Sequence, residues 1–396
     1  MPTSEQVRVP VARPWLGEEE VEALRRPLLS GWVTQGPEVA SFEAEFASAV
    51  GAPHACAVAN CTVALQLALR AAGVGAGDEV VTVSHSFIAT ANSIRYQGGI
   101  PVFVDVEPGG VNMDPDRVAE ALGPRTKALL VVHQLGMPAD LGRLLPLARR
   151  HGIPVIEDAA CAVGSEIEGQ PLGMPHGDAC CFSFHPRKLL TTGDGGMITT
   201  RHPEWDRRFR LWRQHSMSVN DQARHGSNEV IFESYEELGY NYRMTDLQAA
   251  VGRVQLRRLE EILRVRRAQI DRYQELLKGT GLILPQEPSW GRTNWQSYLV
   301  RLPEGVDQKG FMQRLLDRGI STRRGVMCAH LEPAYWNEPW RCTGRLPGCD
   351  HAHGICPNLR HSEEALKRGV ILPAWHDLPG PVLERVAREV REALAG

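Results

Sequence analysis

From residue 55 onwards, short apolar runs alternate with amphipathic stretches, and this alternation is the feature that most constrains the fold. The apolar runs lie at 55–59, 79–83, 100–106, 127–133 and 154–157, and the amphipathic stretches lie at 62–72, 88–97, 115–122 and 141–150. Continuous apolar runs are typical of strands that are buried on both faces, and the amphipathic stretches are typical of helices that cover them. The pattern predicts an α/β fold with a mostly parallel central sheet covered by helices. Ligands are then expected outside the carboxyl ends of the strands.

The length of 396 residues predicts one large domain and a smaller one. We expect an N-terminal segment over 1–36, a large domain over 37–260 and a smaller α+β domain over 261–396. Outside the alternating region, the periodicity predicts helices at 17–29, 37–50, 203–215, 244–279, 308–318 and 381–394, and strands at 197–200, 297–302 and 321–326.

Composition excludes several classes of protein. The net charge of -3, with no basic run, argues against a nucleic-acid partner. No stretch approaches about 18 uninterrupted apolar residues, so no membrane span is expected. The first residues do not resemble a signal peptide, and the odd count of nine cysteines favours reduced thiols, so we expect a cytoplasmic protein.

The most informative stretch is 180–188, Cys-Cys-Phe-Ser-Phe-His-Pro-Arg-Lys, followed by a glycine-rich bend at 193–196. It predicts a buried strand with Phe182 and Phe184 on one face and Ser183 on the other, and a turn that presents Lys188. Only five of the 44 Lys+Arg residues are lysines. An amine can form an imine and a guanidinium cannot, so Lys188 is a candidate nucleophile. The alternative is a surface lysine beside a hairpin.

Three more chemical groups occur at predicted strand ends. Thr62 opens a predicted helix, where backbone N–H groups can hold a phosphate, although it could equally be a helix cap. Phe87 could stack on a flat ring or belong to the core. Glu157 and Asp158 end a strand on opposite sides, so only one of them can face a ligand, where a carboxylate would keep a ring nitrogen protonated. Together with Lys188, these are the parts of a pyridoxal 5'-phosphate (PLP) site.

The sequence resembles the DegT/DnrJ/EryC1/StrS aminotransferase family, the sugar-aminotransferase branch of fold-type-I PLP enzymes, over nearly its whole length. The motifs that carry the resemblance lie at 31–37, 77–80, 86–92, 101–105, 157–160, 182–188, 193–196 and 239–244. The resemblance implies that Lys188 links to the cofactor and later moves the substrate proton. It also implies that Asp158 pairs with the ring nitrogen and that Phe87 stacks on the ring.

Further roles follow from the same resemblance. Cys61, Thr62 and Ser183 occupy the phosphate-binding positions, and Asn241 matches a position that reaches the phosphate of a neighbouring subunit, which implies a homodimer with shared active sites. Cys161 would lie near the ring hydroxyl. Substrate contacts are expected from Trp32, His185, Arg243 and His330 and from the loops at 216–228 and 323–330.

Two residues depart from the family pattern. Cys161 stands where Gln or His is usual, and a thiol is a weaker hydrogen-bond partner. Cys61 replaces a usual glycine, and its Cβ would disfavour a left-handed backbone. We also expect desolvation and nearby positive charge to lower the pKa of Lys188 towards neutrality.

These features predict a PLP-dependent aminotransferase that moves an amino group from an amino acid, glutamate or glutamine, to a keto-sugar that is linked to a nucleotide. A cyclitol (inosose) acceptor, a PLP-dependent sugar dehydratase and a non-catalytic regulator on the same fold are the alternatives. The presence of Lys188 and Asp158 favours transamination.

A Cys/His cluster lies outside the resemblance, at Cys342, Cys349, His351, His353 and Cys356, with His361 nearby. Its spacing could ligate zinc but matches no standard finger, so we expect no metal and a solvated loop instead. Metal analysis of protein purified without a histidine tag is the test.

Overall fold

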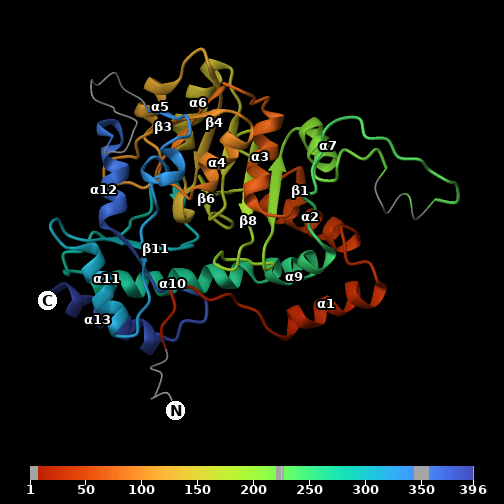
Figure 1. Cartoon of the computed structure of the whole chain (residues 1–396). Helices are drawn as coiled ribbons and strands as arrows, with labels where there is room; N and C mark the ends of the chain where they lie inside the picture. The colour runs from red at the N-terminus through yellow and green to blue at the C-terminus, as the bar shows by residue number, and fades with distance from the viewer. Residues whose placement is uncertain (1–7, 220–223, 225–226, 343–355, 396) are drawn as a thin grey trace.

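The computed structural model describes residues 8–219, 224, 227–342 and 356–395 (Figure 1). A central eight-stranded sheet has the order β1-β9-β8-β5-β4-β2-β3-β13. Only β9 runs against the other strands, because it pairs antiparallel with both β8 and β1 while the remaining neighbours are parallel. The strands are β1 (His54–Val58), β2 (Glu79–Val83), β3 (Ile100–Val104), β4 (Thr126–Val132), β5 (Val155–Asp158), β8 (Ala179–Ser183), β9 (Gly196–Thr200) and β13 (Arg341–Cys342). The predicted α/β class and mostly parallel sheet are confirmed.

Helices cover both faces of the sheet because successive strand residues point to opposite sides. Cys56 packs in the core beneath α3 (Cys61–Ala71), α4 (Ala89–Tyr96) and α7 (Pro203–Trp212). Its neighbour Ala55 packs in the core on the other face. That face is covered by α2 (Pro37–Val50), α5 (Pro115–Ala121), α6 (Leu141–His151) and α9 (Asp246–Arg257).

A second core lies around the three-stranded sheet β11-β14-β12. Its elements are β11 (Tyr298–Arg301), β12 (Arg323–Arg324), β14 (Gly369–Leu372), α11 (Gln308–Asp317) and α13 (Gly380–Ala395). Helix α10 (Leu259–Leu277) joins the two cores, because its first turn packs in the large core and its last turns pack in the small one. Val9, near the start of the described chain, also packs in the small core. The division at residue 260 therefore stays a prediction that runs through a shared helix.

Several element bounds differ from the predictions, and strand β13 was not predicted. The helix predicted at 244–279 is two helices, α9 and α10, which meet at Arg258. The strand predicted at 321–326 is only two residues long. Strand β14 and helix α12 (Arg360–Arg368) were not predicted. Nor were the small strands β6 (Glu166–Ile167), β7 (Gln170–Pro171) and β10 (Gly291–Arg292), which form their own sheet.

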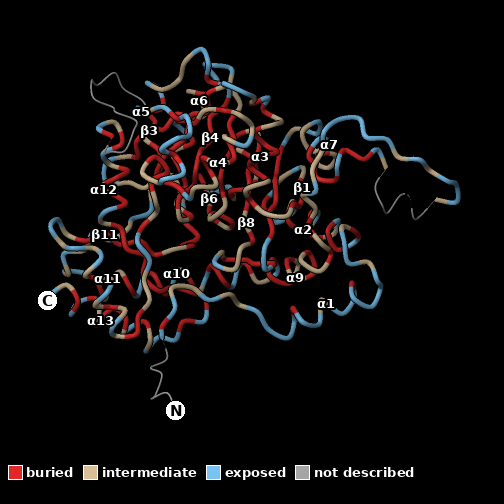
Figure 2. The backbone as a smooth tube through the Cα atoms, in the orientation of Figure 1, coloured by how far each residue is buried: buried red, intermediate tan, exposed pale blue. Residues whose placement is uncertain are grey.

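Burial follows the layers. The sheet and its contacting helix faces are buried, whereas most residues of α1 (Glu18–Ser30) and all of residues 227–239, which follow α7, are exposed or half-buried (Figure 2). Among the helices of the described ranges, none combines the length and the apolar character that a membrane span requires.

Candidate active site

A cavity of about 680 Å³ opens at the carboxyl ends of the parallel strands. The ends of β4, β5 and β8 reach it from the large domain, and β12 and β14 reach it from the small one. Eight of the predicted site residues line it: Cys61, Thr62, Phe87, Asp158, Cys161, Ser183, His185 and Lys188. The predicted position of the site, outside the carboxyl ends of the strands, is therefore where the structure places these side chains.

Lys188 lies in the turn after β8. Its Nζ atom donates a hydrogen bond to the Cys161 sulfur over 2.9 Å. Burial lowers the pKa of Lys188, but Cys161, Cys61 and Asp158 raise it by more, so the net shift is upwards. This direction is opposite to the expected one, because the groups that act most strongly on the amine after burial are Cys161, Cys61 and Asp158 and not nearby cations.

Gln296 holds the backbone on both sides of Lys188. Its Oε1 atom accepts the N–H of Leu189 over 2.8 Å, and its Nε2 atom donates to the carbonyl of Arg187 over 2.5 Å. The side chain is buried and comes from the segment that precedes β11. The sequence analysis missed Gln296, because no local pattern links it to a lysine more than a hundred residues away.

Asp158 is buried at the end of β5, and each of its carboxylate oxygens accepts a hydrogen bond. Thr90 donates its hydroxyl to Oδ2 over 2.7 Å, and the N–H of Ala160 donates to Oδ1 over 3.2 Å. Burial raises the pKa of Asp158, and the bond from Thr90 works against that shift. Glu157 points the other way and contacts His133 and the N–H of Gly177, as the strand alternation predicts.

Replacement of Asp158 by asparagine is expected to slow amino transfer from glutamate about 10²-fold or more, because the carboxylate is the group that can stabilise a protonated ring nitrogen. Thr90→Val keeps the carboxylate and should slow it by roughly tenfold, since only its orientation is loosened. The checks are single-turnover rates and the absorption spectrum of the bound cofactor. Equal rates in wild type and Asp158→Asn would contradict the assigned role.

The start of α3 also lines the cavity. Asn60 caps this helix by accepting the N–H of Val63 over 3.1 Å, and Thr62 lies in its first turn. The backbone comes very close to β9 here, since a Cβ on Gly196 would lie 2.5 Å from the Asn60 carbonyl carbon. Cys61 is the first helical residue and is not among the positive-φ residues, so its Cβ causes no backbone strain. The start of this helix suits a phosphate.

Phe87 provides an exposed aromatic side chain at the cavity. Its side chain follows β2, is 61% exposed and lines the cavity. The structure therefore excludes the alternative that Phe87 belongs to the hydrophobic core. An aromatic face in this position can stack on a flat ring.

Four predicted residues lie outside the cavity lining: Trp32, Asn241, Arg243 and His330. Trp32 donates its indole N–H to the Gln35 carbonyl over 3.2 Å. Asn241 is exposed and bridges to Gln214 near the base of the segment that follows α7. Arg243 is half-buried two residues further on.

The predicted substrate contact of His330 is not supported, because the ring is fully engaged elsewhere. Its Nδ1 atom contacts the Ser84 hydroxyl over 2.6 Å, and its Nε2 atom contacts Glu363 over 3.3 Å. All three side chains are buried. His330 therefore ties the small domain to the end of β2.

Cys349, His351 and His353 of the Cys/His cluster lie outside the described residues. Within the described ranges, no group of three or more His, Cys, Asp or Glu side chains is arranged to hold a metal ion.

An amine, a buried carboxylate, an exposed aromatic face and an anion-binding helix start thus line one cavity of a mostly parallel α/β fold. This set fits PLP, whose aldehyde, ring nitrogen, ring face and phosphate each find a complementary group. The fold and site define a PLP-dependent aminotransferase.

Comparison with known proteins identifies the family. Residues 14–391 match the DegT/DnrJ/EryC1/StrS aminotransferase family, and the chain belongs to that family. It is 40% identical over 393 residues to the spore coat polysaccharide biosynthesis protein SpsC of Bacillus subtilis, covering 98% of this chain and 97% of that protein.

Two solved structures are similar along almost the full chain. The aminotransferase TlmJ from Streptoalloteichus hindustanus is 36% identical, with a TM-score of 0.86, over 98% of this chain and 99% of TlmJ. DesV of S. venezuelae, solved in complex with a ketimine intermediate, is 33% identical with the same TM-score and the same coverage of both chains.

Proposed function

We propose that the protein transfers an amino group from glutamate or glutamine to a keto-sugar that is linked to a nucleotide. The observation that carries this proposal is the placement of the Lys188 amine and the oriented Asp158 carboxylate in one open cavity. The names of the relatives support a sugar acceptor, since SpsC is a polysaccharide biosynthesis protein.

Each residue has a distinct task in this proposal. PLP, when bound, supplies an electron sink for the carbon that loses its proton. Lys188 carries that proton, because its Nζ atom reaches into the cavity. Asp158 holds the ring nitrogen, Phe87 covers the ring, and Cys61, Thr62 and Ser183 receive the phosphate. Cys161, at 2.9 Å from Nζ, is placed to influence both the lysine and the ring hydroxyl.

The test uses the purified holoenzyme in two steps. Glutamate should release 2-oxoglutarate and leave the pyridoxamine form, and keto-sugar nucleotides and inososes are then screened as acceptors. Amino transfer to an inosose alone would favour the cyclitol alternative. Loss of water from a sugar without keto-acid release would favour the dehydratase, and a protein that releases no keto acid at all would contradict the proposal.

A second copy of the chain completes the site in this proposal. Residues 227–239, which follow α7, project from the molecule (Figure 1). In this segment the side chains of Val230, Phe232 and Leu238 are 86%, 90% and 76% exposed. Apolar side chains this exposed are typical of a surface that another protein covers. Asn241 lies at the base of the same segment, outside the cavity of its own chain, so it is free to serve the partner's phosphate site.

The double substitution Phe232→Ser/Leu238→Ser is expected to weaken dimerisation about 100-fold, since buried aromatic and aliphatic anchors dominate such interfaces. Light scattering should give twice the chain mass of 43.8 kDa for wild type and less for the variant. The control is Ile283→Ser, which also replaces an exposed apolar side chain by serine, but in the small domain. A monomeric wild type would refute the dimer.

Mixing two inactive variants tests whether the sites are shared. Lys188→Ala and Asn241→Ala chains, mixed one to one, should recover roughly a quarter of wild-type activity, because each heterodimer contains one intact site. No recovery from a mixture proven to contain heterodimers would show that each site belongs to one chain.

A further inference from the structure

Two arginines at the cavity have no acidic partner. Arg187 lies in the turn beside Lys188, and Arg323 lies on β12 of the small domain, and both line the cavity. Neither forms an ion pair with a carboxylate anywhere in residues 8–219, 224, 227–342 and 356–395. The adjacent Arg324 differs, since its guanidinium pairs with Glu332 over 3.0 Å.

The charges around these arginines show that they act on one another and on the reactive end of the cavity. Burial lowers the pKa of Arg323, and the charge of Arg187 lowers it further, whereas Cys161 has the opposite effect. Since the Cys161 sulfur lies 2.9 Å from Lys188 Nζ, Arg323 belongs to the same end of the cavity as the amine. An anion that binds between two guanidinium groups reduces the electrostatic repulsion between them.

His185, the predicted substrate contact beside them, is not a third cation. Burial lowers its pKa, and the charges of Arg187, Lys188 and Arg323 lower it further, with a partial offset from Asp194. The ring is therefore neutral at pH 7, and its Nδ1 atom accepts the N–H of Arg187 over 3.2 Å. The positive charge at this end of the cavity belongs to the two arginines and Lys188.

We propose that Arg187 and Arg323 form one anion site that both substrates use in turn, holding a carboxylate of the amino donor and then a phosphate of the nucleotide-linked acceptor. This inference rests on the proposed function, in which donor and acceptor meet the same reactive end of one cavity at different times. A planar guanidinium fork matches both carboxylate and phosphate oxygens, so one pair of arginines can serve both. Arg243, predicted as the cation for an anionic substrate, lies outside the lining of this chain's cavity and is not part of this anion site.

The test measures binding of two unreactive probes to the pyridoxamine form of the holoenzyme by calorimetry at about 0.15 M salt. Glutarate carries carboxylates without an amino or keto group, and inorganic pyrophosphate carries the phosphates without a sugar. We expect wild type to bind each probe and pyrophosphate to displace glutarate. Arg187→Gln and Arg323→Gln should each weaken both probes about tenfold or more. Arg324→Gln, the matched control on the same strand, should change them by less than about twofold.

Several results would overturn the shared site. They are simultaneous binding of the two probes, weakening of only one probe by the substitutions, no weakening, or an equal loss in Arg324→Gln. Arg323→Lys separates recognition from charge, because it keeps the charge without the fork and should recover pyrophosphate binding more than glutarate binding. If wild type releases 2-oxoglutarate from glutamate but neither arginine substitution weakens probe binding, the anion site is wrong and the aminotransferase proposal stands. If neither glutamate nor glutamine yields a keto acid, the proposed function itself fails.

Discussion

Substitution of Lys188 by alanine is expected to abolish amino transfer, lowering the rate of 2-oxoglutarate release from glutamate by about 10⁴-fold or more. In the proposed function the side chain both attaches the cofactor and carries the proton, and a positioned proton carrier alone contributes about 10²–10⁴-fold. No second lysine lines the cavity among the described residues, so no other amine can take its place.

Three measurements check this expectation. Borohydride reduction of wild type followed by peptide mapping should place the cofactor on Lys188. Added ethylamine should restore part of the activity of Lys188→Ala, because a free amine can enter the cavity and carry the proton. Lys309→Ala, an exposed lysine on α11, is the control and should behave as wild type. A label on another residue, or an active Lys188→Ala, would refute the proposed mechanism.

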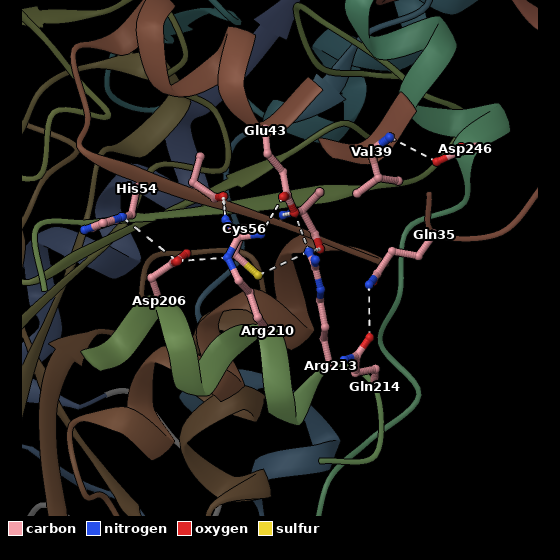
Figure 3. A network of polar contacts seen from close by, with 12 residues as sticks. Gln35, Val39, Glu43, His54, Cys56, Asp206, Arg210, Arg213, Gln214 and Asp246 are labelled. Atoms are coloured by element: carbon pink, nitrogen blue, oxygen red, sulfur yellow. Dashed lines mark hydrogen bonds and ion pairs between the residues drawn. The ribbon is translucent and has the colours of Figure 1, made fainter. Parts of the chain in front are cut away.

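Substitution of Glu43 by glutamine is expected to destabilise the fold by about 3–5 kcal/mol, because it leaves buried arginine charge without its counter-ion. Glu43 on α2 pairs with Arg213 and, over 2.6 Å, with Arg210, both from the region of α7 (Figure 3). The same arginines donate to the carbonyls of Ala55 and Ala57 on β1 over 2.7 Å each. This network joins α2, β1 and α7.

The network also supports the segment that carries Asn241. Gln214 follows Arg213, and its Oε1 atom accepts a hydrogen bond from Gln35 Nε2 over 3.1 Å (Figure 3). Gln214 also forms an isolated β-bridge with Asn241. Asp246 on α9 accepts the N–H groups of Gly36, at 2.8 Å, and Val39, at 3.0 Å. The Trp32 loop and the Asn241 segment are thus both anchored to buried polar groups.

Urea unfolding of the cofactor-free protein measures the loss, with Glu120→Gln as the control. Glu120 forms an exposed pair with Arg117, which should contribute less than about 1 kcal/mol. Burial raises the pKa of Glu43, but Arg213 and Arg210 lower it by more, so the folded-state pKa is depressed. The stabilisation is therefore present above the ordinary pKa of the carboxyl group and is lost as the pH falls through the folded-state pKa. The difference between wild type and Glu43→Gln should shrink on acidification, and a difference that does not depend on pH would contradict the ionic explanation.

The parts of the site that could be predicted from sequence all lie at the ends of regular elements. Thr62, Phe87 and the Glu157/Asp158 pair follow from helix-start and strand-end patterns, because in a parallel sheet the carboxyl ends of the strands meet at one edge. The resemblance then chose Asp158 over Glu157 and added roles for Ser183 and Cys161, which line the same cavity in the structure.

The residues that sequence reasoning missed come from distant segments. Gln296 belongs to the small domain, and Thr90 acts through Asp158, so no local spacing marks them. Arg323 begins the 323–330 segment that was expected to contact the substrate, but no sequence pattern distinguishes it from Arg324. The direction of the Lys188 pKa shift was also wrong. That shift depends on which charges surround the amine in space, and the nearest is the Cys161 sulfur, 27 residues away in the sequence.

The amino-acid sequence by itself determined the α/β class and the order of the chemical groups along the chain, and it singled out Lys188 as the candidate nucleophile. These are properties of local periodicity and of side-chain chemistry, which a chain carries before it folds. Only the tertiary structure decided which cations line the cavity, which groups hydrogen-bond to Asp158 and Lys188, and which of the predicted site residues lie outside the cavity lining. Those outcomes depend on distances between residues far apart in sequence, and only packing of the two cores fixes such distances.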